Sequence, residues 1–388
     1  MPKIDTAAAP ETAIREQDDA FLASLELSQS SWLVTVLQPI TRKFSKFTVK
    51  AGEAGKLLEK LRQQQQKAQR QAKRPLRLVT IFEAGLDGFW LHRLLDAEGI
   101  EVHVVDAGSI AAPRRKRRAK TDRLDGEALI RVLASWLRGE PRVCSMVAVP
   151  TPDEEDERRL SRERQQLATE RTALTNRING LLLSQGVRGY QPLKRDRRER
   201  LEQCVTGDGR ALPRHLKAEL LRLLDRLELV LTQLKAVEAE RDALIRKSAP
   251  DSRIAMLVGM RSIGEQLAYE LCTECLYRDY ANQRKLAAYG GLVPSPWRSG
   301  SIQHDQGLAG SGNPRVRKLM IQLAWLWQRN QPGSELSAWF RDKVKGQGAR
   351  QRRIAVVGLA RKLLIALWRY VTQGVVPAGA VLKPAQAG

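Results

Sequence analysis

The first third of the chain alternates short hydrophobic runs with amphipathic stretches. From residue 21, FLASLEL, SSWLVTVLQ and KFTVK have the alternation typical of β-strands. A helical stretch (EAGKLLEKLRQ) and a Gln/Lys-rich connector over 63–74 come next, and the apolar run over 76–82 predicts a buried strand. An amphipathic helix over about 87–98 and another strand, EVHVVD, follow. Strands that alternate with helices predict an α/β sheet with parallel members.

The middle third has the heptad spacing of long packed helices. Two sets of apolar residues recur at intervals of seven, or of four and three: Leu160, Leu167, Leu174 and Leu181, then Leu216, Leu220, Leu223, Leu227, Val230, Leu234 and Val237. A loop over about 186–213 separates them. The pattern fits an antiparallel hairpin within one chain and an oligomerising coiled coil equally well.

Changes in composition divide the chain into five segments. We expect a polar leader over 1–18 and an α/β catalytic domain over 19–150. A coiled-coil helical region should cover 151–250, and a Gly-punctuated, mainly helical domain should cover 251–376. A Pro/Ala/Gly-rich tail occupies 377–388.

The charge of the chain indicates a polyanionic partner. Its 388 residues include 66 Lys and Arg against 43 Asp and Glu, which gives a formal net charge of +23. Lys and Arg that neutralise phosphates release condensed counterions, so nucleic acid is the first choice and an anionic membrane surface the second.

No segment predicts membrane insertion or export. The apolar stretch over 354–368 is interrupted by Arg361 and Lys362 and is too short for a spanning helix. The N-terminus lacks the apolar region of a signal peptide, and four cysteines are too few for a disulfide framework. We therefore expect a reduced, cytoplasmic compartment. Cys272 and Cys275 form a CxxC, but no second pair or His at a suitable spacing supports a zinc site.

Four carboxylates lie where an α/β nuclease would need them. Glu26 lies in the first strand and Glu83 closes the buried strand, while Asp122 and Asp125 share a face at the start of a helix. Mg²⁺ takes hard oxygen ligands, and phosphoryl transfer needs several of them to converge. Taken singly, each residue is more often a helix cap or a solvated charge, although a charge such as Glu83 that closes an apolar strand is poor core material. Together they predict a magnesium site.

A dense basic run immediately precedes the two aspartates. Six cations fall within seven residues: Arg114, Arg115, Lys116, Arg117, Arg118 and Lys120. Such runs are usually solvated. Its position beside the acidic pair favours contact with a nucleic-acid backbone.

The last third contains a segment that resembles a helix–hairpin–helix. In IAMLVGMRSIGEQLAYEL, a turn with Gly259 and Gly264 between two apolar helices would expose backbone N–H groups to a DNA phosphate. A plain turn with glycine at the helix cap explains the same residues.

A serine in a Gly/Pro-rich stretch is the candidate nucleophile. GGLVPSPWRSGS places Ser299 beside Arg298 in what reads as a loop. A serine hydroxyl can attack phosphate when cations meet the developing charge, although Ser-Gly is also ordinary turn chemistry. Arg315, Arg317 and Lys318, which open a helix in GSGNPRVRKLM, are further phosphate-binding candidates.

Taken in order, these segments resemble the DEDD-type insertion-sequence transposases over about residues 21–370. In that family a RuvC-like domain is joined through a coiled coil to a C-terminal transposase domain. The resemblance implies an RNase H-like fold, with Glu83, Asp122 and Asp125 at the second, third and fourth acidic positions. It implies that Ser299 attacks DNA and forms a covalent phosphoserine link. It also implies an oligomer in which the acidic site of one protomer lies near the serine of another, and a structured guide RNA.

The chain departs from the family pattern at two places. Glu26 stands where the family typically has Asp, which lengthens the side chain by one methylene. The five residues after Ser299 are Gly-Ser-Ile-Gln-His, where the family tends to be more basic.

The sequence therefore predicts a Mg²⁺-dependent DNA transposase or recombinase, an enzyme with DNA and RNA partners. Two alternatives stay open: a RuvC-like, metal-only junction nuclease, and a catalytically degenerate nucleic-acid-binding protein.

Overall fold

The computed structural model describes residues 19–85, 89–110, 126–140, 143–299, 302–308 and 311–384, with backbone alone at 295–299 and 302–306. The chain divides into two compact units, 1–150 with 294–312 and 151–293 with 313–388. The expected leader over 1–18 and the basic run over 114–120 lie outside the described residues.

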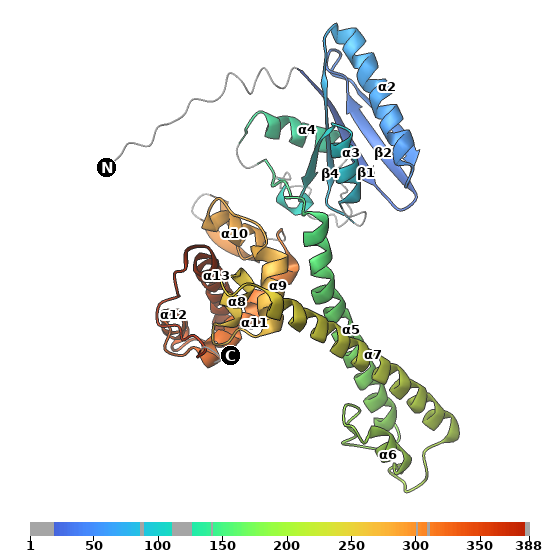
Figure 1. The fold of residues 1–388 in the computed structure, drawn as a ribbon, viewed down its shortest axis with the longest axis vertical. Helices are drawn as coiled ribbons and strands as arrows, with labels where there is room; N and C mark the ends of the chain where they lie inside the picture. Colours follow the sequence, from blue (N-terminus) through green and yellow to red (C-terminus); the bar gives the residue numbers. More distant parts are fainter. Residues whose placement is uncertain are drawn as a thin grey trace. The chain divides into compact units, whose positions relative to one another are not determined.

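The first unit is built on a mixed five-stranded sheet (Figure 1). Its order is β3-β2-β1-β4-β5, and the strands are β1 (Ala20–Leu27), β2 (Ser31–Leu37), β3 (Phe44–Lys50), β4 (Arg77–Glu83) and β5 (Glu101–Val105). β2 is antiparallel to β1 and to β3, whereas β1, β4 and β5 run parallel. The α/β sheet with parallel members is confirmed.

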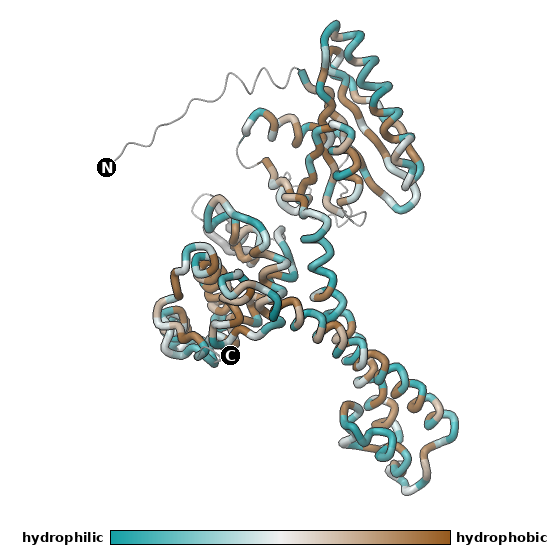
Figure 2. The backbone as a smooth tube through the Cα atoms, in the orientation of Figure 1, coloured by the Kyte–Doolittle hydropathy of each residue, from teal (hydrophilic) through white to brown (hydrophobic). Residues whose placement is uncertain are grey.

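Helices cover both faces of this sheet. On one face, α2 (Ala54–Ala72) and α3 (Trp90–Ala97) bury leucines against the alternate β1 residues that include Phe21 and Leu25. On the other, α4 (Gly126–Leu137) packs on the face that carries Leu22. Figure 2 shows the hydrophobic strands between these helices.

The connector expected over 63–74 was wrong, because α2 continues through it to Ala72. Gln, Lys, Arg and Ala are good helix formers, and this stretch contains neither Gly nor Pro before Pro75. α2 ends at Ala72, because the next residue, Lys73, has a left-handed backbone and caps the helix.

In the second unit, α5 (Pro152–Leu183) and α7 (Arg214–Lys247) pack antiparallel within one chain. Ion pairs fix the direction, since Arg164 contacts Glu238 at 2.7 Å and Arg177 contacts Glu219 at 2.7 Å. The loop between them contains α6 (Arg197–Glu202). Of the two arrangements that the heptad pattern allowed, the structure shows the antiparallel hairpin within one chain.

The rest of the second unit is helical, as expected. A single apolar core joins its elements, which are α8 (Arg253–Val258), α9 (Glu265–Leu271), the π-helical turn η3 (Cys272–Leu276), α10 (Gln283–Tyr289), α11 (Pro314–Asn330), α12 (Glu335–Val344) and α13 (Ala349–Gln373). Across the described residues, no helix has the length and hydropathy needed to cross a membrane.

The expected tail folds back on the second unit. Val381 accepts a hydrogen bond from the amide of Arg261, and the amide of Lys383 donates to Gly259. The Lys383 ammonium donates to the carbonyls of Val258 and Ile263. The residues after α13 therefore cover the turn between α8 and α9.

We predict that Gly126→Ala destabilises the first unit. A Cβ at this position would lie 2.8 Å from Oγ of Ser24 and 2.9 Å from Oε1 of Glu26, and it would also overlap Thr35. Because a packed interior resists added methyl groups, the free energy of unfolding should fall by about 1–3 kcal/mol. Urea denaturation measures this. Gly55→Ala in α2, where a Cβ meets nothing within 4 Å, is the matched control and should be neutral or stabilising.

Candidate active site and nucleic-acid interface

Two of the predicted acidic residues end neighbouring parallel strands. The register pairs Leu25 of β1 with Phe82 of β4, so Glu26 and Glu83 are the next residues along the two strands. Side chains alternate between the faces of a sheet, which places both glutamates on the face that α4 covers. The structure thus brings Glu26 and Glu83 to one edge of the sheet.

Glu26 also holds the beginning of α4. Its Oε1 accepts a hydrogen bond of 2.9 Å from the amide of Gly126, and Ser24 donates to the carbonyl of Gly126 at 2.8 Å. A carboxylate at a helix N-terminus satisfies an amide that has no partner within the helix and faces the positive end of the helix dipole. No described residue donates a hydrogen bond to Oε2 of Glu26.

The two remaining acidic candidates, Asp122 and Asp125, lie outside the described residues. Among the residues that are described, no three His, Cys, Asp or Glu side chains gather as a metal site. The described chain resumes at Gly126, the residue that follows Asp125 and that Glu26 binds.

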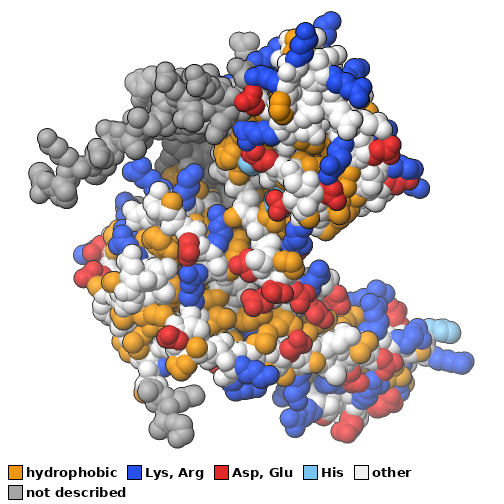
Figure 3. Space-filling model, turned by 45° about the horizontal axis from the view of Figure 1, so that its top comes forward, with side chains coloured by type: hydrophobic (Ala, Val, Ile, Leu, Met, Phe, Trp, Pro, Cys, Tyr) orange, Lys and Arg blue, Asp and Glu red, His pale blue; other side chains and the backbone are white. Residues whose placement is uncertain are grey.

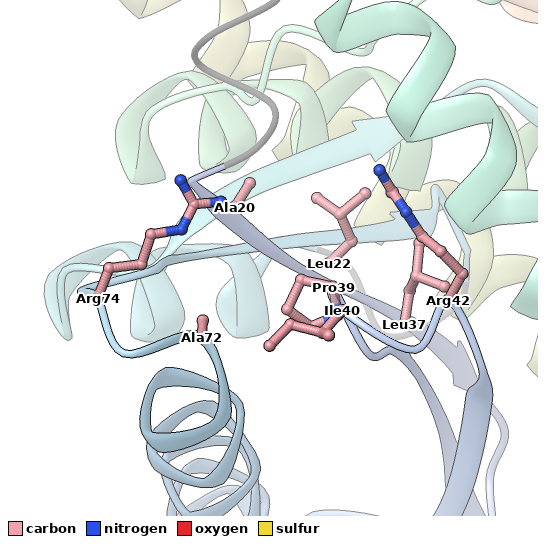
Figure 4. Close-up of a pocket in the computed structure, with 8 residues that line it drawn as sticks. All are labelled: Ala20, Leu22, Leu37, Pro39, Ile40, Arg42, Ala72 and Arg74. Atoms are coloured by element: carbon pink, nitrogen blue, oxygen red, sulfur yellow. The ribbon is translucent and has the colours of Figure 1, made fainter.

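A hollow in the first unit lies away from the acidic residues (Figure 4). It has a volume of about 280 Å³ and is lined by Ala20 and Leu22 at the start of β1, with Arg42 and Arg74 at its rim. Glu26 is four residues further along β1, about 13 Å away at the usual rise of a strand. The hollow therefore plays no part in the acidic site.

Ser299 lies at the end of a strand, not in the loop that the sequence predicted. β6 (Pro294–Ser299) and β7 (Ile302–Leu308) form an antiparallel hairpin in which Ser299 pairs with Ile302 and Arg298 with Gln303. Two residues connect the strands, and such short connections are typical of β-hairpins. The prolines of β6 masked the strand pattern, although proline is tolerated where a strand is an edge. The side chains of Arg298 and Ser299 lie outside the described part.

The residues that flank this hairpin in sequence, which we call its base, belong to the second unit and are held there on both sides. Before β6, the guanidinium of Arg317 donates to the carbonyl of Gly291 at 2.9 Å. After β7, the amide of Asn313 donates to the carbonyl of Tyr289 at 2.6 Å, and its side chain caps α11. One N–H group of the Arg317 guanidinium is therefore already hydrogen-bonded within the protein. Arg315 and Lys318 on the same helix are exposed.

A buried carboxylate that the sequence did not reveal lies beside this anchor. Glu274, in the π-helical turn, is 1% exposed and accepts from Arg162 at 2.8 Å and 3.2 Å. Asn313 donates to it at 3.2 Å. Burial alone would raise the pKa of Glu274, but the hydrogen bonds and charge of Arg162 outweigh burial and lower it. The pair joins α5 to the base of the hairpin.

The turn with Gly259 and Gly264 connects two helices, as the sequence predicted. Several of its backbone groups are already bonded, since Arg261 donates to Val381 and Gly259 accepts from Lys383. Neither glycine has a positive φ. Within the described chain, residues near the C-terminus therefore pack on this turn and hydrogen-bond to it.

The CxxC cysteines are packed in the core of the second unit. Burial raises the pKa of both Cys272 and Cys275 to about 12, so both are thiols at neutral pH.

Comparison with known proteins identifies the family. A profile described as "Transposase IS116/IS110/IS902 family" matches residues 255–338, and the DEDD transposase profile of IS110 elements matches residues 27–185. A protein of Sinorhizobium fredii (strain NBRC 101917 / NGR234) whose name describes it as a transposase, y4rJ, is 53% identical over 96% of this chain and 97% of its own length. The chain belongs to the DEDD transposases of the IS110 family.

More distant relatives carry the same description. The transposase for insertion sequence element IS1328 of Yersinia enterocolitica is 28% identical over 58% of this chain and 66% of its own length. The transposase for insertion sequence element IS1111A of Coxiella burnetii is 26% identical over 66% of this chain and 67% of its own length. This IS110-family transposase is thus an enzyme that acts on DNA. Figure 3 shows groups of Lys and Arg side chains, interspersed with Asp and Glu, on the surface in view.

We predict that Glu274→Ala destabilises the second unit by about 2–4 kcal/mol, less than for a fully buried pair because Arg162 is 44% exposed. Since the pKa of Glu274 is lowered in the folded state, its contribution is present above the pKa of an unfolded glutamate and is lost as the pH falls through the folded value. Urea denaturation at neutral and acidic pH measures both effects. Glu163→Ala, which changes an exposed carboxylate next to Arg162 on α5, is the control, and an equal loss in the two variants would contradict the prediction.

Proposed function

We propose that this transposase cuts and rejoins DNA with Ser299 as nucleophile, beside a divalent metal ion held by Glu26, Glu83, Asp122 and Asp125. One observation carries the proposal. Glu26 and Glu83 end adjacent parallel strands on one face, and Glu26 binds the amide of the residue after Asp125. The described chain thus resumes at this edge, directly after Asp125 in sequence. The mixed sheet and its acidic edge support an RNase H-like, RuvC-like fold.

The donor set fits a magnesium ion. All four residues offer carboxylate oxygens, the ligands that Mg²⁺ prefers. Oε1 of Glu26 is engaged by Gly126, while no described residue donates to Oε2, which leaves that oxygen for an ion. The metal would supply charge stabilisation at the phosphate oxygens.

The position of the hairpin supports a joint role of the serine and the acids. The hairpin belongs to the same compact unit as the sheet. A Cβ on Gly108 would lie 3.2 Å from Cα of Ser311, the residue shortly after β7. Gly108 follows the carboxyl end of β5, at the edge of the sheet where Glu26 and Glu83 lie.

The chemistry is a transesterification that needs no outside energy. The Ser299 hydroxyl gives up its proton, its Oγ bonds to phosphorus, and the bond from phosphorus to one sugar oxygen breaks. That oxygen takes a proton and becomes the hydroxyl of the released strand. A sugar hydroxyl from another strand reverses the step, frees the serine and rejoins the DNA.

We propose that the following cations and glycines hold nucleic acid: Arg114, Arg115, Lys116, Arg117, Arg118, Lys120, Gly259, Gly264, Arg298, Arg315, Arg317 and Lys318. Exposure of Arg315 and Lys318 supports this role for them. The bonds already made by Arg317 and by the turn with Gly259 leave them a smaller part. An oligomeric, RNA-guided enzyme, with a catalytic domain over 19–150, a coiled coil over 151–250 and a transposase domain over 251–376, stays a prediction.

We expect Ser299→Ala to abolish the covalent protein–DNA adduct, because the variant has no oxygen to bond to phosphorus. A denaturing gel run after reaction with DNA carrying the ends of the element detects the adduct. Ser301→Ala, which removes a serine hydroxyl two positions further along the sequence, should keep the adduct. Cleavage by Ser299→Ala without an adduct would make water the nucleophile and the protein a metal-only nuclease.

We expect Asp122→Ala, Asp125→Ala and Glu26→Gln each to lower Mg²⁺-dependent cleavage by at least about tenfold while leaving DNA binding intact. Glu26→Gln is the sharpest of these, because its amide oxygen can still accept from Gly126. Its thermal stability should therefore stay near that of the wild type. Asp96→Asn, an exposed residue of α3, is the control. Full cleavage by Glu26→Gln would show that Glu26 is only a helix cap.

A further inference from the structure

A basic segment that none of the motifs above includes lies at the junction of α12 and α13. Between residues 341 and 353 there are six cations and a single acid, Asp342. The cations are Arg341, Lys343, Lys345, Arg350, Arg352 and Arg353. We call residues 341–353 the α12–α13 basic segment.

The segment stands clear of the core of the second unit. All ten residues from 345 to 354 are exposed, and they include the first turn of α13. Arg352 precedes Val356 by four residues and Leu359 by seven, so the three share one face of the helix. Val356 and Leu359 are buried, whereas Arg352 is exposed. The first turn of α13 therefore extends past the core with every side open to solvent.

These cations lack the acidic partners that several arginines of the second unit have. On α5, Arg162, Arg164 and Arg177 each form an ion pair with a carboxylate. Within the described residues, no cation of the α12–α13 basic segment forms an ion pair, and only the side chain of Arg341 donates a hydrogen bond, to the carbonyl of Pro332. The charge of the segment is therefore uncompensated.

The position of the arginines also works against the stability of the helix. α13 begins with Gly348 as its N-cap, has no acidic residue in its first turn, and carries Arg350, Arg352 and Arg353 within its first five residues. Cations at the positive end of a helix dipole are unfavourable. The stability of the helix therefore does not explain three arginines at this end of α13. Binding of an anionic ligand would explain them.

We propose that the α12–α13 basic segment binds the phosphodiester backbone of a nucleic acid, as a site separate from the acidic residues and from Ser299. Phosphate is the anion that a row of point charges on an open surface recognises without reading sequence. The site holds the nucleic acid and takes no part in the chemical step. It goes beyond the function proposed above and does not depend on Ser299 being the nucleophile.

The test measures binding of the full-length protein to a mixed-sequence DNA duplex and to an RNA duplex of equal length, by fluorescence anisotropy over a range of salt concentrations. The variant is the triple change Arg350→Gln, Arg352→Gln and Arg353→Gln. Three lost phosphate contacts should reduce the slope of log K against log salt by about 2–3 on DNA, and affinity at low salt should fall at least about tenfold. The corresponding triple change to Lys should keep the salt slope and the affinity at low salt, because Lys has the same positive charge as Arg.

The matched control removes the same charge from α7, with Lys235→Gln, Arg246→Gln and Lys247→Gln, all exposed residues. Circular dichroism should show the same helix content for all variants, and the α13 Gln triple should be at least as thermally stable as the wild type, because it removes cations from the positive end of a helix dipole. A loss specific to the α13 triple supports the proposal, and loss on the DNA or the RNA duplex tells which backbone is bound. An equal loss in both Gln triples, or no loss on either duplex, overturns it. Formation of the Ser299 adduct is scored separately, so failure here leaves the proposed chemistry untouched.

Discussion

The acidic site depends on how closely the start of α4 approaches the sheet. Gly126 lies against Ser24 and Thr35, both fully buried, and its peptide is held from two sides by Ser24 and Glu26. Only a residue without a Cβ allows this approach. The consequence is long-range: residues 100 positions apart in sequence are joined by one hydrogen bond. The carboxyl ends of β1 and β4 and the beginning of α4 thereby converge on one edge.

The base of the serine hairpin depends on a second buried polar contact. Glu274 would be costly to bury alone, and its bonds to Arg162 and Asn313 offset that cost. Because Asn313 also caps α11 and Tyr289 accepts its amide, one carboxylate ties α5, the π-helical turn and the end of the hairpin together. A π-helical turn bends the helix register locally, and such turns are frequent at functional sites.

How far the sequence predicted these features depends on whether a periodic pattern carried them. The strands and the α5–α7 pair were found because burial repeats every two residues or every seven. The region over 63–74 was misjudged because polar composition resembles a linker even where helix propensity is high. The strand at Ser299 was hidden by its prolines. Glu274 could not be found, since a single glutamate in CTECL has no spacing that distinguishes a buried ligand of an arginine from a solvated charge.

The net charge of +23 becomes informative only when the structure separates two kinds of cation. Arginines such as Arg162 and Arg198 are matched to carboxylates and stabilise the fold or its surface. Burial and pairing explain them, so they say little about a ligand. Unmatched cations that oppose a helix dipole have no such explanation among the residues that the structure describes. For a protein that acts on DNA, the natural balancing charge is the phosphate backbone, and counterion release supplies the free energy that the fold does not.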